Sequence, residues 1–307
     1  MKIYINNSNE NWICDRMREE IMTYGGPVHF TENPAEAETI WLLANWVWRH
    51  TPLDLLTSKR VVATIHHIDP NKINKQDYLE RDKFTDAYHI PNEKTAKYFP
   101  KEINKNKIKI IPYWGNDKLW TPSTFPKEFL CNKYSIPNNQ LIVGSFQRDT
   151  EGFDLKTPKL SKGPDIFCEI VEKIKPKPHV VLCGWRRQYI ISRLEAAGIT
   201  YSYYEMANLQ EISELYNCLD LYLVTSRHEG GPQALLECSL KKTPILSTNV
   251  GMANEVLSKE CLMQGPEDFL ESIHSKTFDH SEENHRKVQE FKIENLFDQY
   301  MNFLKAA

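Results

Sequence analysis

Two glutamates, Glu229 and Glu237, stand eight positions apart and bracket a Gly-Gly-Pro turn that follows an apolar run. Gly230 and Gly231 let the backbone approach a ligand closely, and Pro232 suits the first turn of a helix. That helix start directs free N–H groups at an anion. Glu229 lies in the loop beside this anion site, while the carboxylate of Glu237 can accept two hydroxyl hydrogen bonds from a sugar ring. The spacing predicts a site for a phosphorylated ligand that contacts both carboxylates.

A second group of residues carries positive charge. A predicted strand ends at Gly144, Arg148 follows in the loop, and Lys162 stands at the mouth of the next helix. Ligands bind at the carboxyl ends of strands in open α/β sheets. Fixed cations there stabilise the negative charge that grows on a phosphate when a sugar leaves it. The long segment 150–161 also carries Lys159, which is an alternative to Lys162 as the phosphate lysine.

A histidine pair follows another apolar run. We expect Val61–Ile65 to be a strand, with His66 at its carboxyl end facing a cleft. His66, His67 and Asp69 lack the further spaced ligands of a metal site, so none is predicted there. No D-x-D sequence, which holds a divalent metal in many sugar transferases, occurs in the chain. We therefore expect the cations and the helix start to neutralise the phosphates without a metal.

Short apolar strands alternate with helical patterns along the chain, which is typical of parallel sheets covered by helices. In the first half of the chain, this pattern predicts five strands: Lys2–Asn6, Ile40–Leu43, Arg60–Ile65, Ala87–Ile90 and Ile108–Ile111. It predicts helices near Trp12–Tyr24, Lys75–Thr85 and Glu93–Phe99. The second half predicts strands at Leu141–Gly144, His179–Cys183, Ile199–Tyr204, Asp220–Thr225 and Pro244–Ser247. Between them, Pro112–Pro137 is rich in proline and reads as a linker.

The overall composition agrees with two domains and narrows the function. A chain of 307 residues with 41% hydrophobic residues has enough apolar material for two cores. The net charge of −3 argues against a nucleic-acid partner. Seven scattered cysteines without a C-x-x-C pair predict reduced core thiols. The opening strand lacks a secretory h-region, and Ile40–Trp48 is too short to span a bilayer, so we expect a cytoplasmic protein.

The stretch from Glu229 to Glu237, together with Lys242–Gly251 and Glu255, resembles the donor-site signature of family 4 retaining glycosyltransferases of the GT-B fold. The resemblance covers most of 141–257 and extends only loosely over the first half. Two positions depart from the family. Met252 stands where a second glycine usually follows Gly251, and Lys241-Lys242 replace a small residue and a glycine.

The resemblance implies two Rossmann-like domains with parallel sheets facing a central cleft and a last helix that crosses back onto the first domain. The acceptor-side domain would span 1–130 with a C-terminal helix at about 285–307, and the nucleotide-sugar domain would span 131–284. The long amphipathic pattern from Glu282 to Leu304 is expected to be this crossing helix.

The resemblance also implies a retaining, metal-independent hexosyltransferase of polysaccharide biosynthesis. It would need no cofactor and would move a sugar from a UDP or GDP donor to a hydroxyl of a glycan or glycolipid. The implied catalytic residues are Arg148, Lys162, Glu229 and His66, and the implied donor-binding residues are Gly144, Gly230, Gly231, Pro232, Glu237 and Gly251. In this scheme the two cations hold the diphosphate, Glu229 positions the donor sugar, and Glu237 binds the ribose.

Several alternatives stay open. A non-catalytic sugar-nucleotide or glycan-binding subunit fits the missing glycine loop at Asn7–Asn9 and the presence of Met252. A sugar-nucleotide epimerase of similar fold is a third possibility, and His66 is alternatively a packed structural residue. A run of lysines would either contact an anionic membrane that carries a lipid-linked acceptor or form a solvated face: Lys94, Lys97, Lys101, Lys105, Lys107 and Lys109.

Overall fold

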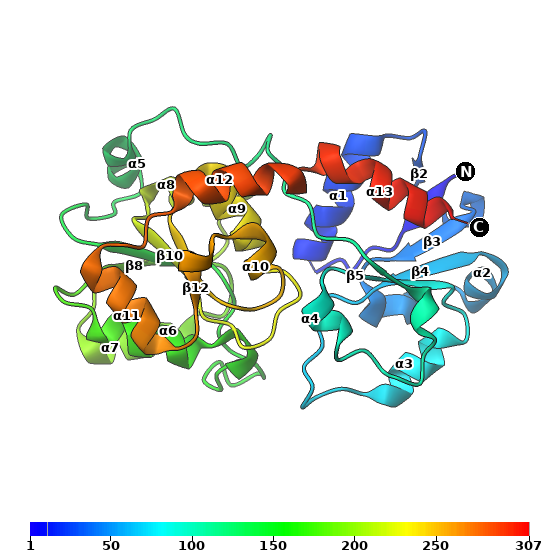
Figure 1. Cartoon of the computed structure of the whole chain (residues 1–307), viewed down its shortest axis with the longest axis horizontal. Helices are drawn as coiled ribbons and strands as arrows, with labels where there is room; N and C mark the ends of the chain where they lie inside the picture. The colour runs from blue at the N-terminus through cyan, green and yellow to red at the C-terminus, as the bar shows by residue number, and fades with distance from the viewer. Residues whose placement is uncertain (11, 307) are drawn as a thin grey trace. The chain divides into compact units, whose positions relative to one another are not determined.

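The computed structural model describes residues 1–10 and 12–306 and divides the chain into two compact α/β units (Figure 1). Unit 1 consists of Met1–Trp114 and Phe291–Ala307, and unit 2 consists of Gly115–Glu290. Ala307, the final residue of the predicted C-terminal helix, lies outside the described residues. The assignment of acceptor and donor roles to domains bounded at 130 and about 285 stays a prediction.

Unit 1 contains a six-stranded parallel sheet in the order β2-β1-β3-β4-β5-β6. Its strands are β1 (Ile3–Ile5), β2 (Phe30–Thr31), β3 (Thr39–Leu42), β4 (Arg60–Thr64), β5 (Ala87–Ile90) and β6 (Ile108–Ile110). Its helices are α1 (Ile13–Gly25), α2 (Leu53–Ser58), α3 (Lys75–Asp82), α4 (Glu93–Ala96) and α13 (Ile293–Lys305). The central strands β3 and β5 are buried along their whole length because helices cover both faces.

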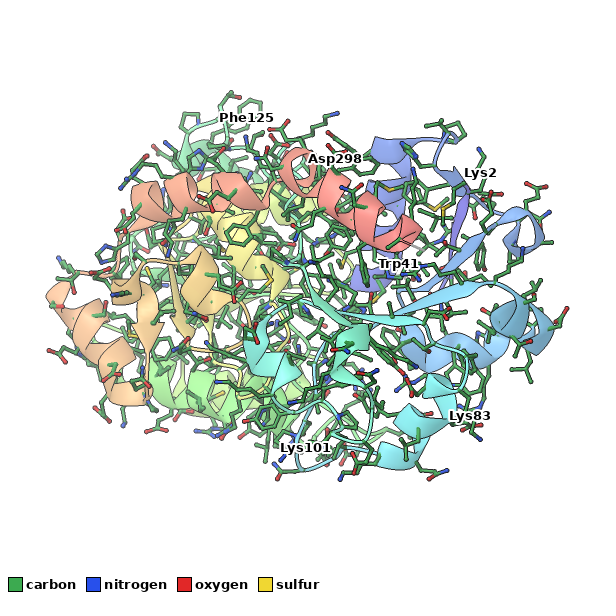
Figure 2. All side chains as sticks on the ribbon, turned by 45° about the vertical axis from the view of Figure 1, so that its right-hand side comes forward. Lys2, Trp41, Lys83, Lys101, Phe125 and Asp298 are labelled. Atoms are coloured by element: carbon green, nitrogen blue, oxygen red, sulfur yellow. The ribbon has the colours of Figure 1, made fainter. Side chains whose placement is uncertain are left out.

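Alternate side chains of the unit 1 strands serve two different layers. Ile40 and Leu42 point into one hydrophobic cluster, against which side chains of α2 and α3 also pack. Trp41 belongs to the opposite face, where its ring lies 5.7 Å from Tyr300 of α13 (Figure 2). The hydroxyl of Thr39 also donates to the carbonyl of Leu304 at 3.1 Å. The last helix therefore completes one face of the first sheet.

Unit 2 contains a second six-stranded parallel sheet, in the order β12-β11-β10-β7-β8-β9. Its strands are β7 (Ile142–Ser145), β8 (His179–Cys183), β9 (Tyr201–Tyr204), β10 (Leu221–Val224), β11 (Ile245–Thr248) and β12 (Leu262–Met263). Its helices are α5 (Lys127–Lys133), α6 (Pro164–Lys173), α7 (Gln188–Ala197), α8 (Leu209–Cys218), α9 (Gln233–Lys241), α10 (Ala253–Val256), α11 (Pro266–Ser275) and α12 (Ser281–Val288). In one layer α6 packs with α7 and α11, and in the other α9 packs with α8 and α12 (Figure 1).

The predicted strands are confirmed in position, but three expectations need correction. The two-residue edge strands β2 and β12 were missed because two residues carry no periodicity. The predicted linker contains α5, which buries Leu130 and Cys131. The predicted single helix from Glu282 to Leu304 is wrong, because α12 ends at Val288, a 3₁₀ turn follows, and the extended backbone of Lys292 caps α13.

All seven cysteines are free and buried, as predicted. Burial raises the pKa of the Cys168 thiol to about 12, so this thiol is protonated at neutral pH. Among the described residues, no helix is long and apolar enough to cross a membrane.

Candidate functional site

The candidate site lies at the carboxyl edge of the unit 2 sheet. Strands β7 and β10 are hydrogen-bonded neighbours, with Gly144 opposite Tyr222, so the loops that follow them leave the sheet side by side. The loop after β7 carries Arg148 and leads to Lys162, and the loop after β10 carries Glu229 before α9 begins. The topology therefore brings the loop of Arg148 and Lys162 next to the loop of Glu229, while the roles of these residues stay predictions.

Lys162 and Glu229 are in direct contact. The ammonium of Lys162 forms an ion pair with Oε1 of Glu229, and the hydroxyl of Ser226 donates to the same oxygen at 3.1 Å. The Lys162 side chain is 22% exposed and the Glu229 side chain 8% exposed. A partly buried ion pair at the edge of a parallel sheet is a polar centre that a charged ligand can reach on one side.

A backbone seam between the two loops fixes this contact. The amides of Arg227 and His228 both donate to the carbonyl of Ser161, at 2.8 and 3.1 Å. The hydroxyl of Thr225 donates to the carbonyl of Gly163 at 2.8 Å. Gly163 has the left-handed angles φ 62° and ψ 41°, and a β-carbon there would overlap the carbonyl oxygen of Thr225. Only glycine allows this approach, so the seam depends on its position.

Arg148 lies at the start of the loop after β7. Its Nε donates to the carbonyl of Thr150 at 2.8 Å, and the side chain is half-buried. The side-chain amide of Gln147 donates to the carbonyl of Lys162 at 3.1 Å, which ties this loop to the lysine. Burial, and then the charges of Lys162 and Arg148, lower the pKa of Lys159 to about 8. Three cations therefore influence one another at this edge.

Glu237 lies inside unit 2, on the first turns of α9. It is 5% exposed, and the hydroxyl of Tyr216 donates to its Oε2 at 2.6 Å. Burial and the nearby charge of Glu237 raise the pKa of Tyr216 well above its usual value, so the tyrosine stays a donor. The sequence did not anticipate this partner, because α8 carries Tyr216 and the two residues meet only in the folded sheet. One carboxylate oxygen is thus already used within the protein.

The glycines of the predicted site have different surroundings. Gly251 has φ 51°, and a β-carbon there would lie 2.5 Å from the carbonyl oxygen of Gly230, so the two glycine loops touch. Pro232 is the N-cap residue of α9 rather than its first residue. Gly144 lies inside β7, where a β-carbon would overlap the side chain of Leu219. The close packing of Leu219 therefore explains why a glycine stands at position 144. A direct contact of Gly144 with ligand stays a prediction.

The sequence patterns missed a buried ion pair beside the loop of Arg148. Arg187 is fully buried, and its Nε lies 3.3 Å from Oδ2 of Asp149. The same guanidinium donates to the carbonyls of Ser145 and Cys183 at the ends of β7 and β8. The sequence offered one signal for this pair: Asp149 follows β7 and Arg187 follows β8, and these two strands are neighbours in the sheet. This pair holds the two strand ends together.

His66 follows β4 in unit 1, as predicted, and both ring nitrogens are engaged. Nε2 lies 2.7 Å from the carbonyl of Leu43 and must donate to it, so Nδ1 accepts the hydroxyl of Tyr113 at 2.6 Å. Burial lowers the pKa of His66 to about 4. The ring is therefore neutral at pH 7, with one defined tautomer.

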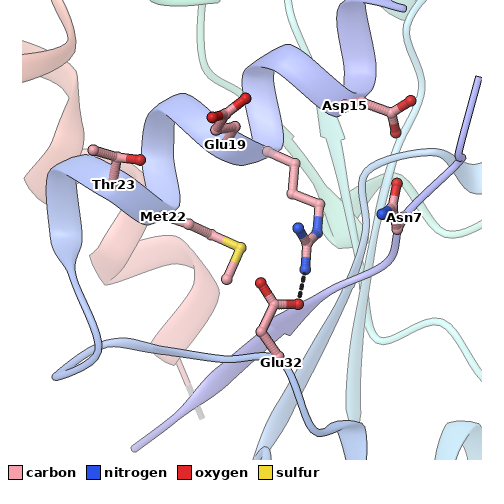
Figure 3. Close-up of a pocket in the computed structure, with 7 residues that line it drawn as sticks. Asn7, Asp15, Glu19, Met22, Thr23 and Glu32 are labelled. Carbon is pink, nitrogen blue, oxygen red and sulfur yellow. Dashed lines mark hydrogen bonds and ion pairs between the residues drawn. The ribbon is translucent and has the colours of Figure 1, made fainter. Parts of the chain in front are cut away.

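An open pocket of about 490 Å³ lies along α1 of unit 1 (Figure 3). Polar and charged side chains line it together with Met22: Asn7, Asp15, Glu19, Thr23 and Glu32, the last of which forms an ion pair with Arg18. Of the loop Asn7–Asn9, which lacks the family's glycines, Asn7 lines this pocket. The carboxylate of Asp15 accepts two hydrogen bonds from Ser8, one from its amide and one from its hydroxyl.

Two further expectations concern ions and surfaces. Among the described residues, one group has metal-ligand spacing, Glu260, His280 and Glu283, whose ligand atoms lie within 4.8 Å of one another. In the lysine run, Lys101 is exposed (Figure 2), whereas the Lys107 ammonium is bound by Asp82 at 2.7 Å. Membrane contact by these lysines stays a prediction.

Comparison with known proteins identifies a domain within unit 2. Residues 155–276 match the family model described as Glycosyl transferases group 1. A curated relative, the probable sucrose-phosphate synthase of Thermosipho melanesiensis, is 24% identical over 212 residues, which cover 66% of this chain and 48% of that protein. The chain thus spans about half the length of this relative.

Solved structures share the fold over the whole chain. HepE of Anabaena, in complex with UDP-glucose, superposes with a TM-score of 0.76 at 13% identity, covering 100% of this chain and 99% of HepE. WaaG, a glycosyltransferase involved in lipopolysaccharide biosynthesis, gives 0.71 at 12% identity and 100% of both chains. Sucrose-phosphate synthase of Thermosynechococcus elongatus gives 0.70 at 14% identity, covering 98% and 81%. The fold is GT-B, and the matched domain supports the glycosyltransferase class of enzyme.

Proposed function

We propose that this chain is a retaining hexosyltransferase of glycosyltransferase family 4, acting in polysaccharide biosynthesis. It takes a sugar from a nucleoside-diphosphate sugar and transfers it to a hydroxyl of a glycan or glycolipid. The observation that carries the proposal is the Lys162–Glu229 ion pair, which lies between the loops after β7 and β10 and beside the glycine turn that opens α9. This arrangement offers cations, the N-terminal end of a helix and a carboxylate within one small region.

Each residue has a separate task in this reaction. Arg148 and Lys162 stabilise the charge that grows on the leaving diphosphate, which lowers the barrier more than it strengthens ground-state binding. Glu229 and the Gly230-Gly231 backbone orient the donor sugar. Glu237 binds the ribose hydroxyls, and Gly251 supports the turn at Gly230.

The proposed donor is a UDP sugar, used without a metal ion. Support for uridine comes from HepE, whose structures hold UDP-glucose, UDP and glucose, and UDP. Metal independence rests on the supply of protein cations at the diphosphate position. The leaving phosphate takes the acceptor's proton on the same face, so no protein nucleophile is needed.

The acceptor side is assigned to unit 1. His66 is neutral and held by Leu43 and Tyr113, and we place it beside the reacting sugar as a positioning group. The exposed lysines around Lys101 would bring the enzyme to the inner face of an anionic membrane, where a lipid-linked acceptor resides.

Donor binding and turnover of matched variants test the proposal. Wild-type protein should bind UDP-glucose or another UDP sugar more tightly than the GDP sugars, and should release UDP when a glycan acceptor is added. Arg148→Ala and Lys162→Ala should lower turnover about a hundred- to a thousand-fold. Lys173→Ala, on the exposed surface of α6, is the control and should leave turnover unchanged. Wild-type rates in both site variants would refute the diphosphate assignment.

The two carboxylates should behave differently in the same assay. Glu237→Gln should mainly raise the donor KM, because ribose contacts are equal in the ground and transition states. Glu229→Gln should lower kcat, because the orientation of the donor sugar decides whether the anomeric carbon meets the acceptor. Reversed effects would mean that the carboxylates have exchanged roles.

A second candidate is a non-catalytic subunit that binds a sugar nucleotide on the same fold. The buried Met252, at the position of a family glycine, favours it. Product analysis separates the candidates, since an enzyme forms a new glycosidic bond and releases UDP, whereas a binding subunit returns the donor intact.

A further inference from the structure

The segment between Arg148 and Lys162 folds as a closed hairpin. Its arms join at the bridge between Thr150 and Pro158, and the amide of Glu151 donates to the carbonyl of Thr157 at 2.9 Å. Asp154 closes the tip by accepting the amides of Lys156 and Thr157 and the hydroxyl of Thr157. These bonds lower the pKa of Asp154 to about 2. The hairpin is therefore an ordered element that can hold a side chain in a defined place.

The base of this hairpin delivers Lys159 to the candidate site. The amide of Lys159 donates to the carbonyl of Asp149 at 2.7 Å, and its own carbonyl accepts the amide of Lys162 at 2.8 Å. Lys159 is thus clamped between the residue after Arg148 and the lysine that pairs with Glu229. Its position is fixed by backbone bonds on both sides.

The ammonium of Lys159 is close to other charged groups but is bonded to none of them. Among the described residues, no hydrogen bond or ion pair is formed by its ammonium, whereas Lys162 is paired with Glu229. The charged groups that face Lys159 are Arg148 and Lys162, which repel it, and Glu229 and Glu151, which attract it. A half-buried ammonium that repels two neighbouring cations is unfavourable unless an anion joins it.

We propose that Lys159 is a third ligand of the donor diphosphate, and that the incoming phosphates form the direct ion pair that its ammonium lacks within the protein. The proposal rests on the proposed function and adds a residue to its donor site. Arg148, Lys159 and Lys162 together then bring three positive charges to a diphosphate that carries two negative ones, with Glu229 and Glu151 as the neighbouring carboxylates. The hairpin between Arg148 and Lys162 is the element that makes the third contact available.

The proposal predicts that donor binding takes up a proton near pH 8. Without donor, burial and the two cations hold the pKa of Lys159 at about 8. Bound phosphates favour the charged ammonium and raise this pKa. The contribution of Lys159 to donor affinity is therefore complete below pH 8 and is lost as the pH rises from there through the raised pKa of the bound state.

The test is the Kd of UDP-glucose measured by calorimetry between pH 7 and pH 9 for wild type, Lys159→Met, Lys159→Arg and Lys156→Met. At pH 7, Lys159→Met should bind about tenfold more weakly, as expected for the loss of one charge-assisted contact. Lys159→Arg should keep wild-type affinity at pH 7 and hold it at pH 9, because guanidinium stays charged. Lys156→Met removes an exposed lysine from the hairpin tip and should behave as wild type.

The outcomes separate this proposal from the proposed function. If wild type binds UDP-glucose and Lys159→Met binds equally well, Lys159 is not a ligand, and the donor site stands without it. An unchanged loss of affinity at high pH in Lys159→Arg would also overturn the role of Lys159. Absence of donor binding in wild type would overturn both ideas.

Discussion

The substitution Gly163→Ala should destabilise unit 2 far more than an alanine at a glycine of the same conformation elsewhere. Gly163 has φ 62° and ψ 41°, and Gly198 has φ 60° and ψ 41°. Both variants force alanine into the left-handed region, which costs about 1–2 kcal/mol. At Gly198 the nearest contact of the added carbon is the flexible Lys177 ammonium at 3.5 Å. That variant therefore measures the backbone conformation alone.

At Gly163 the added carbon meets backbone instead. It would overlap the carbonyl oxygen of Thr225 and lie 2.7 Å from its carbonyl carbon, so the two loops must separate. Separation weakens the Thr225 hydroxyl bond to Gly163 and the two amide bonds to Ser161. At about 1 kcal/mol for each of these bonds, the extra loss is about 3 kcal/mol beyond that at Gly198.

Urea unfolding of wild type, Gly163→Ala and Gly198→Ala measures this difference, with UDP-glucose binding as a second readout. Only Gly163→Ala should also weaken donor binding, because Lys162 moves with the seam. Equal free energies of unfolding for the two variants would refute the idea that the close approach at Thr225 holds the loops together.

Three other predictions follow from the same structure. The pKa of His66 is lowered to about 4, so the folded protein binds fewer protons than the unfolded one between pH 4 and pH 6.5. The free energy of unfolding should therefore fall as the pH drops through this window. Urea unfolding at pH 7 and pH 5 should show a smaller loss of stability in the His66→Gln variant than in wild type. An equal slope in both proteins would contradict the assigned burial. Asp149→Asn leaves Arg187 without its buried carboxylate and should lower the free energy of unfolding by about 3–5 kcal/mol. Lys173→Met, which removes a surface ion pair, should change it by about 0–1 kcal/mol. Similar urea midpoints for the two variants would argue against a buried charge pair. Sugar transfer from a UDP donor should continue in excess EDTA, and recovery of a lost activity by magnesium or manganese would show that a metal neutralises the diphosphate.

The sequence allowed the architecture to be predicted because its signals are local. The runs His179–Cys183 and Ile142–Ser145 are apolar and short, and they became adjacent parallel strands. The break between α12 and α13 could not be read in the same way, because the amphipathic pattern continues through it. The interruption depends on the extended backbone of Lys292, which no side-chain periodicity records.

Within the candidate site, residue types were more predictable than contacts. The glycine turn and the charges of Lys162 and Glu229 are visible in the sequence, but their ion pair depends on the approach of Gly163 to β10. The partner of Glu237 is Tyr216, which comes from another helix and reaches the carboxylate only after the layers pack. Contacts between distant segments are set by tertiary packing, which local patterns do not encode.

The place of α13 in unit 1 has a consequence for how the chain folds during synthesis. The last strand of its sheet ends at Ile110, and the helix that covers Trp41 begins at Ile293, so roughly 180 residues separate them. A ribosome that adds about 5–20 residues per second needs roughly 10–40 s to bridge this interval. During that time α13 is missing from the face of the nascent sheet on which Trp41 lies. We expect chaperones to bind this face on the ribosome, and the emergence of Tyr300 to release them.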